Sequence, residues 1–211
     1  MLAKIPFLLK FLLPNRLWNL PREEKAIYLT FDDGPIPEVT PWVLEQLRHY
    51  NAKATFFCIG DNVRKHPEVL QQILAEGHKL GNHTFNHLNG WRTSSNRYLQ
   101  NVQQAQGELE RYGNAGNPGR LFRPPYGKIR EKQVRLLKEQ NFRVVMWEVL
   151  SKDYDQRLSP EKCLQNVIRN VGPGSIIVFH DSLKAERNLK ATLPRVLEHY
   201  SRQGIEFRAL I

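Results

Sequence analysis

Two adjacent carboxylates, Asp32 and Asp33, follow a short apolar run near the start of the chain. The β-branched and aromatic content of Ala26–Leu29 predicts a buried strand, which Gly34 and Pro35 bring to an end. Because side chains alternate along an extended chain, the two carboxylates should point in different directions. Neighbouring anions are rare beside a core strand unless a cation is present. We therefore expect one carboxylate to bind a metal ion and the other to remain free for proton transfer.

Two histidines with ligand spacing occur later in the chain. His83 and His87 form a His-x-x-x-His pair in a loop that follows a short strand expected over 78–82. In isolation such a pair more often has a structural role, so the carboxylates at the end of another strand decide the interpretation. One carboxylate and two imidazoles leave coordination positions open for water and substrate, as a catalytic metal site requires.

Three more polar side chains come directly after expected strands, namely Arg123, Asp153 and His180. Arg123 precedes two prolines and, taken alone, could be a surface arginine before a turn. Apolar strands alternate with helical patterns throughout, which predicts an α/β fold with a parallel sheet and helices outside it. In a (β/α) barrel the loops after the strands form the active-site face. Five polar groups on that face indicate a reaction centre.

Hydrophobic periodicity places the individual elements. Strands are expected over 26–29, 53–60, 78–82, 121–127 with its exit, 143–150, 175–181 and 207–210. Helices are expected over 40–49, 67–77, 94–113, 131–141, from 159 onward, and 191–203. Thr40 is a suitable N-cap for the first of these helices, and the segment 114–119 reads as a turn.

Length and composition indicate one soluble globular domain. The chain has 211 residues, 41% hydrophobic and 25% charged, and neither Cys58 nor Cys163 fits a metal or redox spacing. We expect two buried, reduced thiols and no disulfide framework. The net charge of +10 comes without a nucleic-acid-binding motif or a dense basic run, so no nucleic-acid partner is expected. Attraction to a membrane surface or an anionic polymer fits the charge better.

The first twenty residues are apolar and basic, and they are interrupted by Lys4, Lys10 and Pro14. This run is too short to span a bilayer and lacks a clear signal-peptide cleavage site. We expect residues 1–24 either to pack on the domain as an opening helix or to lie on a membrane as an amphipathic anchor. Residues 25–211 form the expected catalytic domain. A cytoplasmic or membrane-peripheral location is slightly favoured, and the oligomeric state is not predicted.

Five stretches, in this order, resemble the five motifs of the polysaccharide deacetylases, carbohydrate esterase family four. They are Thr30–Pro35, His83–His87, Arg123–Tyr126, Asp153–Tyr154 and Val178–His180. The similarity runs from about Lys25 to the C-terminus. It implies a distorted (β/α) barrel of seven or eight strands. It also implies a metal-dependent deacetylase that removes acetyl groups from N-acetylated sugars and releases acetate.

Matching the motifs position by position implies a role for each residue. The metal ligands, usually for zinc, would be Asp33, His83 and His87. Asp32 would be the general base, and Arg123 would hold its carboxylate. The backbone N–H of Tyr126 would stabilise the oxyanion, His180 would be the general acid, and Asp153 would set its protonation. The residues expected at the substrate are Pro124, Tyr126, Trp147 and Tyr154.

The chain departs from the family pattern at two positions. Leu150 stands where many members have an aspartate, and Tyr154 stands where many have a tryptophan. Both departures concern the choice of substrate more than the metal. Peptidoglycan, a chitooligosaccharide and a lipid-linked sugar all remain open as the glycan.

The residue pattern leaves two alternative functions open and argues against a third. The first is a metal-dependent hydrolase on the same scaffold that acts on a non-sugar amide or an O-acetyl ester. The second is an inactive glycan-binding homologue, although every motif position is filled. A glycosidase needs two carboxyl groups about 5 Å or more apart and no metal-binding histidines, so adjacent aspartates argue against it.

Overall fold

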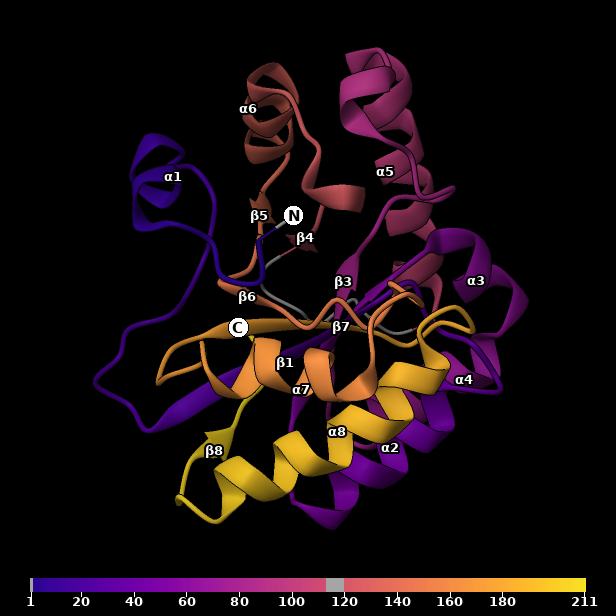
Figure 1. The fold of residues 1–211 in the computed structure, drawn as a ribbon. Helices are drawn as coiled ribbons and strands as arrows, with labels where there is room; N and C mark the ends of the chain where they lie inside the picture. The colour runs from indigo at the N-terminus through magenta and orange to yellow at the C-terminus, as the bar shows by residue number, and fades with distance from the viewer. Residues whose placement is uncertain (1, 113–119) are drawn as a thin grey trace.

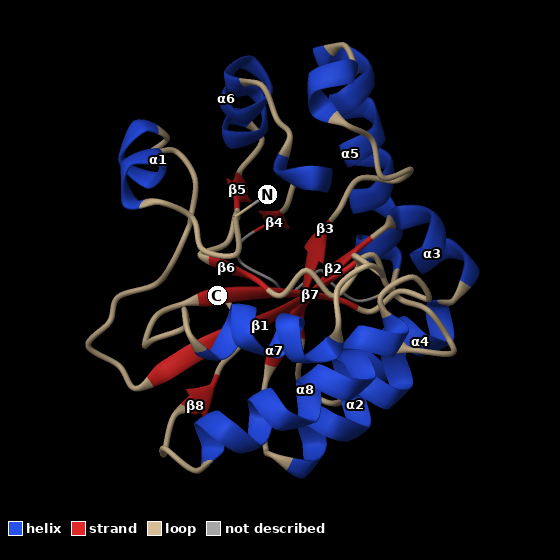
Figure 2. Cartoon of the chain, viewed as in Figure 1, coloured by secondary structure: helices blue, strands red, loops and turns tan. Residues whose placement is uncertain are grey.

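The computed structural model describes residues 2–112 and 120–211. Parallel strands form one curled sheet in the order β5-β4-β3-β2-β1-β7-β6, and β8 pairs with the start of β1 (Figure 2). The strands are β1 (Ala26–Asp32), β2 (Ala54–Cys58), β3 (Lys79–Asn82), β4 (Arg120–Phe122), β5 (Phe142–Val144), β6 (Val149–Leu150), β7 (Ile176–His180) and β8 (Glu206–Phe207). In the described residues β5 and β6 end the sheet order without pairing. The expected α/β fold, a distorted barrel in one domain, is confirmed.

Helices cover the outside of the sheet. They are α1 (Phe7–Leu12), α2 (Thr40–His49), α3 (Gly60–Lys65), α4 (Pro67–Ala75), α5 (Ser95–Arg111), α6 (Glu131–Glu139), α7 (Pro160–Ile168) and α8 (Glu186–Ser201). In Figure 1, α2, α7 and α8 lie below the sheet, and α5 and α6 stand above it. The helix α1 stands apart at the left of the same view.

The central strand β1 is buried along its whole length. Its Phe31 ring stacks on Phe56 of β2 at 5.0 Å and on Phe179 of β7 at 6.1 Å between ring centroids. Continuous burial of this kind is typical of a parallel strand covered on both faces. The strand also extends further than expected, to Asp32, so the first carboxylate belongs to the strand itself.

The expectation of one strand over 143–150 is wrong, because two short strands, β5 and β6, occupy this stretch. The amino-terminal segment separates them. The Leu17 N–H donates to the Val144 carbonyl at 2.8 Å, and the Met146 N–H donates to the Leu17 carbonyl at 2.7 Å. Further on, the Ile5 N–H donates to the Glu148 carbonyl at 2.9 Å. Some backbone groups of this stretch thus find partners in the amino-terminal segment, whereas the Val145 and Glu148 N–H groups donate to Phe122 and Ile176.

Smaller differences concern helix boundaries. The helix α3 was not expected, and α8 begins at Glu186 rather than at 191. The N-cap of α2 is Val39, and Thr40 is the first helical residue. The Thr40 hydroxyl donates to Asp181 at 2.6 Å. Ser159 does cap α7, accepting from the Lys162 N–H. The turn expected over 114–119 lies outside the described residues.

The amino-terminal segment is tied to the domain on either side of α1. Ile5 and Trp18 are buried in the core, whereas α1 contains no buried residue. Lys10 pairs with Glu148 at 2.6 Å, and the buried Arg16 side chain lies at 2.5 Å from Glu131. Within the described residues, every helix is too short or too polar to cross a bilayer.

The stacking at the centre of the sheet predicts a large loss of stability in a Phe31→Ala variant. Truncation leaves a cavity between Phe56 and Phe179, and the free energy of unfolding should fall by about 3–5 kcal/mol. Urea unfolding measures this loss. Leu183→Ala is the control, because that side chain is 58% exposed and its loss should change stability by about 0.5 kcal/mol or less. A loss below about 1 kcal/mol for Phe31→Ala would contradict the packing.

Candidate active site

A cavity of about 610 Å³ opens at the carboxyl ends of the strands. It collects most of the residues expected to carry the chemistry: Asp32, Asp33, His83, His87, Pro124, Tyr126, Trp147, Tyr154 and His180. The two remaining members of that set, Arg123 and Asp153, are 0% exposed and lie behind the cavity wall. Asp32 and His180 are register partners on β1 and β7, so their side chains leave the sheet on the same face.

Three potential metal-binding groups meet beside Asp32. The Asp33 Oδ1 atom lies 3.4 Å from His87 Nε2 and 3.8 Å from His83 Nε2. Ligand atoms of the three residues all lie within 4.8 Å of one another, and no other such group occurs in the part of the chain that is described. Asp33 Oδ1 is buried and has no hydrogen-bond partner among the described residues. A buried, unpaired carboxylate oxygen facing two imidazoles fits a bound cation.

Both histidines are in the form that binds a metal. The Nδ1–H of His83 donates to the Arg123 carbonyl at 2.7 Å, which leaves the Nε2 lone pair directed toward Asp33. Burial lowers the pKa of His83. Burial also lowers the pKa of His87 to about 4. Neutral imidazoles at neutral pH offer the lone pairs that a metal ion needs.

The backbone around these ligands is in an unusual conformation. Asp33 has φ 86° and His87 has φ 54°, values in the left-handed region that non-glycine residues rarely adopt. The Asn62 side chain donates to the Asp33 carbonyl at 2.7 Å, and the Thr84 hydroxyl accepts from the Leu88 N–H at 3.0 Å. These bonds hold the strained residues in place, as is common at functional sites.

The buried Arg123 guanidinium binds the other carboxylate. Its Nη1 donates to Asp32 Oδ1 at 2.7 Å and to the Thr30 hydroxyl at 2.6 Å, and its Nη2 donates to the Met146 carbonyl at 2.8 Å. The guanidinium also lies 4.1 Å from the centroid of the Phe57 ring. Arg123 is therefore no surface residue before a turn, and it fixes one oxygen of Asp32.

The second oxygen of Asp32 remains available. Asp32 Oδ2 lies 4.0 Å from His83 Nε2, beyond hydrogen-bonding distance. Burial raises the pKa of Asp32, but the charge and hydrogen bond of Arg123 outweigh burial, so the pKa lies below its ordinary value. Asp32 is thus an anion at neutral pH with one oxygen held and one free.

On the other side of the cavity, His180 is paired with a buried aspartate. His180 Nδ1 lies 2.8 Å from Asp153 Oδ1, and the His180 backbone N–H donates to Asp153 Oδ2, also at 2.8 Å. Burial lowers the pKa of His180, but the charge and hydrogen bond of Asp153, with smaller contributions from Asp33 and Asp32, raise it to about 9. His180 is therefore an imidazolium at neutral pH, with Nε2 left to donate a proton.

Tyr126 stands at the mouth of the cavity. Tyr126 has a φ of 61°, and its hydroxyl lies 3.1 Å from His87 Nδ1. Tyr126 is 52% exposed and lines the cavity. The groove walls include Leu150 and Tyr154, the two positions that depart from the family pattern, and the Tyr154 ring meets His180 edge to face.

Several supporting residues were missed by the sequence analysis. Thr30 bonds Arg123, and its alternation with Asp32 along β1 could have indicated a shared face. Asp181 accepts from the Gly34 N–H at 3.0 Å and from the Thr40 hydroxyl, and burial raises the pKa of Asp181 to about 8. Nothing local in the sequence links Asp181 to Gly34, because this contact depends on the pairing of β1 with β7.

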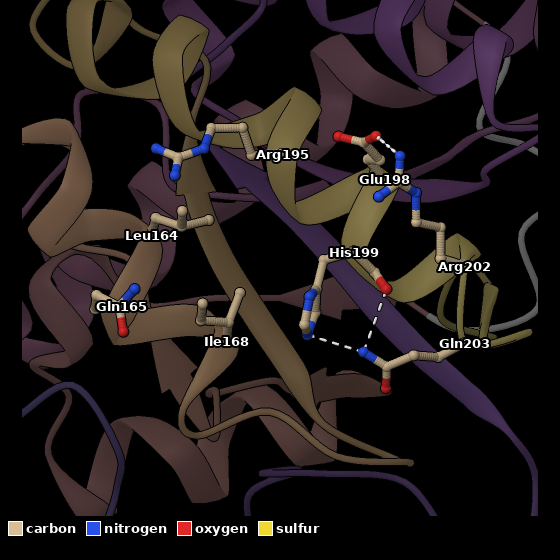
Figure 3. Close-up of a pocket in the computed structure, with 8 residues that line it drawn as sticks. All are labelled: Leu164, Gln165, Ile168, Arg195, Glu198, His199, Arg202 and Gln203. Carbon is tan, nitrogen blue, oxygen red and sulfur yellow. Dashed lines mark hydrogen bonds and ion pairs between the residues drawn. The ribbon is translucent and has the colours of Figure 1, made fainter.

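A second hollow lies between α7 and α8 (Figure 3). His199 Nε2 bonds the Gln203 side chain at 2.8 Å, and Glu198 pairs with Arg202 at 2.5 Å. These polar groups satisfy one another along one helix face, as i,i+4 pairs on a solvated surface do. The chemistry is therefore assigned to the cavity at the strand ends.

The known proteins that this chain resembles are polysaccharide deacetylases. The sequence profile described as polysaccharide deacetylase matches residues 19–145. A peptidoglycan-N-acetylglucosamine deacetylase of Bacillus cereus is 36% identical over 192 residues, which are 90% of this chain and 88% of that protein. A chitooligosaccharide deacetylase of Azorhizobium caulinodans is 36% identical over 163 residues, which are 77% of each chain.

A solved structure is similar over almost the whole chain. It is a peptidoglycan N-acetylglucosamine deacetylase in complex with 4-naphthalen-1-yl-N-oxidanyl-benzamide. Its TM-score is 0.88 at 33% sequence identity, and the match covers 98% of this chain and 95% of that one. This likeness extends the match beyond residue 145, where the sequence profile ends.

The Arg123–Asp32 pair predicts a pH-dependent loss of stability in Arg123→Met. The wild-type pair lowers the pKa of Asp32, so its contribution is present above about pH 4 and is lost as the pH falls. Removing the guanidinium leaves a buried, unpaired carboxylate at neutral pH and should cost about 3–5 kcal/mol. At low pH Asp32 is protonated, so the loss should be smaller. Urea unfolding of metal-free protein at about pH 7 and at a pH well below about 4, where Asp32 is protonated, measures both values.

The double variant Arg123→Met with Asp32→Asn is the matched control. It removes the uncompensated charge and should recover part of the stability at neutral pH. Equal losses at both pH values, with no recovery in the double variant, would show that the pair contributes only packing.

Proposed function

Because this chain belongs to the polysaccharide deacetylase family, we propose that it hydrolyses the N-acetyl amide of N-acetylglucosamine-type sugars in a glycan and releases acetate. One observation carries the proposal: Asp33, His83 and His87 converge beside a free oxygen of Asp32 in the cavity that also contains His180. The names of the bacterial relatives, a peptidoglycan and a chitooligosaccharide deacetylase, support this class of substrate.

The donor set of the proposed metal site fits zinc. One carboxylate and two neutral imidazoles, contributed by Asp33, His83 and His87, match the ligands that Zn²⁺ takes in catalytic sites. A bound divalent ion supplies positive charge that polarises an amide carbonyl and acidifies water at neutral pH. The remaining steps depend on side chains and backbone groups of the protein itself.

Asp32 acts as the general base. Its Oδ2 atom is free of Arg123 and accepts a proton from the water that attacks the acetyl carbon. Arg123 keeps Asp32 ionised and oriented, and therefore acts through Asp32 without touching the substrate. As the carbonyl carbon becomes tetrahedral, its oxygen gains negative charge, and the backbone N–H of Tyr126, a residue of the cavity lining, donates to it.

His180 acts as the general acid. An amine leaves readily only when its nitrogen is protonated, and His180 Nε2 donates that proton, since Nδ1 is held by Asp153. The products are acetate and the free amino sugar. The hydroxyl of the attacking water ends on the acetyl carbon, and a proton ends on the amine. Pro124, Trp147 and Tyr154 line the groove and provide apolar and aromatic surface against which a sugar ring can pack.

Acetate release from a panel of glycans tests the proposed reaction. The panel contains peptidoglycan, chitooligosaccharides and a lipid-linked N-acetyl sugar, with an O-acetylated glycan as the alternative substrate. Activity on N-acetylated members should vanish with a chelator and return with added zinc. Activity that survives the chelator would contradict the metal site, and activity confined to the O-acetyl ester would contradict the amide.

Two variants separate the base from the ligands. Asp32→Asn should keep bound zinc while acetate release falls by about 10²–10⁴-fold, because only proton transfer is removed. His83→Ala should lose the zinc itself, measured by elemental analysis after dialysis. Full activity in Asp32→Asn, or zinc retained at full stoichiometry in His83→Ala, would overturn the respective assignment.

The raised pKa of His180 predicts the pH dependence of the reaction. The general acid is active while His180 is protonated, so the rate declines as the pH rises through its pKa. Asp153→Asn removes the charge that raises this pKa, so the alkaline limb should move to lower pH by about one unit or more. Measuring kcat against pH in both proteins tests this. An unmoved alkaline limb would assign the proton donor to another group.

A further inference from the structure

The helix α1 presents its apolar side chains to solvent. Together with Leu2, the exposed apolar residues form the amino-terminal apolar patch: Leu2, Phe7, Leu8, Leu9, Phe11 and Leu12. Phe7 is 80% exposed and Phe11 is 72% exposed. The spacing of Phe7, Leu8, Phe11 and Leu12 places them on one side of the helix. Contiguous exposed apolar surface of this kind marks a contact site for another phase or molecule.

The charged side of α1 faces the domain, which is the reverse of an ordinary surface helix. Lys10 lies on the other side of the helix, is only 13% exposed, and pairs with the buried Glu148 at 2.6 Å. Arg22 contacts the same Glu148 oxygen at 2.8 Å. A surface helix normally buries its apolar face and exposes its cations. Here the ion pair anchors the helix, and the apolar face is left outward.

Backbone contacts hold α1 in this orientation. Before the helix, the Ile5 N–H donates to the Glu148 carbonyl and the Leu150 N–H donates to the Ala3 carbonyl at 2.8 Å. After it, the buried Trp18 indole donates to the Leu13 carbonyl at 3.2 Å. The patch is therefore presented by an anchored segment.

Charge complementarity identifies the surface that the patch fits. The chain carries a net charge of +10. Near α1, Lys138 of α6 lies 3.5 Å from Asn15, and α6 also exposes Lys132 and Arg135. Of the two acids on α6, Glu131 is paired with Arg16. Exposed apolar side chains on a strongly basic protein match an anionic bilayer, in which the rings enter the headgroup region and cations meet phosphates.

A second copy of the chain fits the patch less well. A six-residue helix is only about 9 Å long, whereas a stable interface buries about 800 Å² on each partner. We propose that α1 inserts its apolar face into the headgroup region of an anionic membrane and makes the protein membrane-peripheral. In Figure 1, α1 lies at the left, apart from the helices α2, α7 and α8 below the sheet.

Vesicle co-sedimentation of the full chain tests this proposal independently of the enzymatic activity. Wild-type protein should bind vesicles of phosphatidylglycerol and phosphatidylcholine more tightly than vesicles of phosphatidylcholine alone. The double variant Phe7→Ser with Phe11→Ser should bind at least tenfold more weakly. Lys138→Gln should weaken binding to the anionic vesicles by about fivefold. Leu183→Ser is the matched control, since it removes a leucine that is 58% exposed on another segment, and it should bind as wild type does.

Thermal melting followed by circular dichroism shows whether each variant is folded, and the exposed positions should leave Tm nearly unchanged. Three results would overturn the proposal: no binding of the wild type to anionic vesicles, undiminished binding of the folded double variant, or a lipid-free dimer that the double variant abolishes. The last result would assign the patch to a second copy of the chain.

Discussion

A guanidinium buried in the protein interior organises this site. Arg123 is 0% exposed, and a cation in that position is tolerated only when nearby acceptors satisfy it. Asp32, Thr30 and the Met146 carbonyl are those acceptors, and they come from two segments far apart in the sequence. The Arg123–Asp32 ion pair gives the two adjacent carboxylates different roles. Asp32 directs one carboxylate oxygen toward Arg123. The carboxylate of the next residue, Asp33, is directed toward the histidines.

The amino-terminal segment supports the same site from the open side of the sheet. It supplies backbone partners between β5 and β6, where the described strands do not pair with each other. The residues that it holds include Met146, which accepts from Arg123. They also include the stretch that carries Trp147 and Leu150 to the groove wall. The amino-terminal segment therefore both fills the gap between β5 and β6 and positions residues of the cavity wall. The same segment contains α1, whose apolar side chains face outward.

Much of this arrangement could be predicted because the reactive residues directly follow strands. In a parallel sheet the strand ends meet at one edge, so motifs at those ends converge whatever their separation in sequence. The sequence-based predictions that were wrong concern contacts between segments that are distant along the chain. The split of 143–150 arises from Leu17, and the hydroxyl of Thr40 is directed to Asp181 across paired strands. The outward-facing apolar side of α1 also runs against the usual pattern, because Lys10 finds Glu148 inside the domain.

The central claim is that one cation binds Asp33, His83 and His87 while Asp32 stays out of its coordination shell. Anomalous diffraction at the zinc absorption edge from crystals grown with zinc tests it most directly. The account predicts a single peak about 2.0–2.2 Å from one Asp33 oxygen and from Nε2 of each histidine, with Asp32 still bonded to Arg123. A peak ligated by Asp32, or no peak between the two imidazoles, would contradict it.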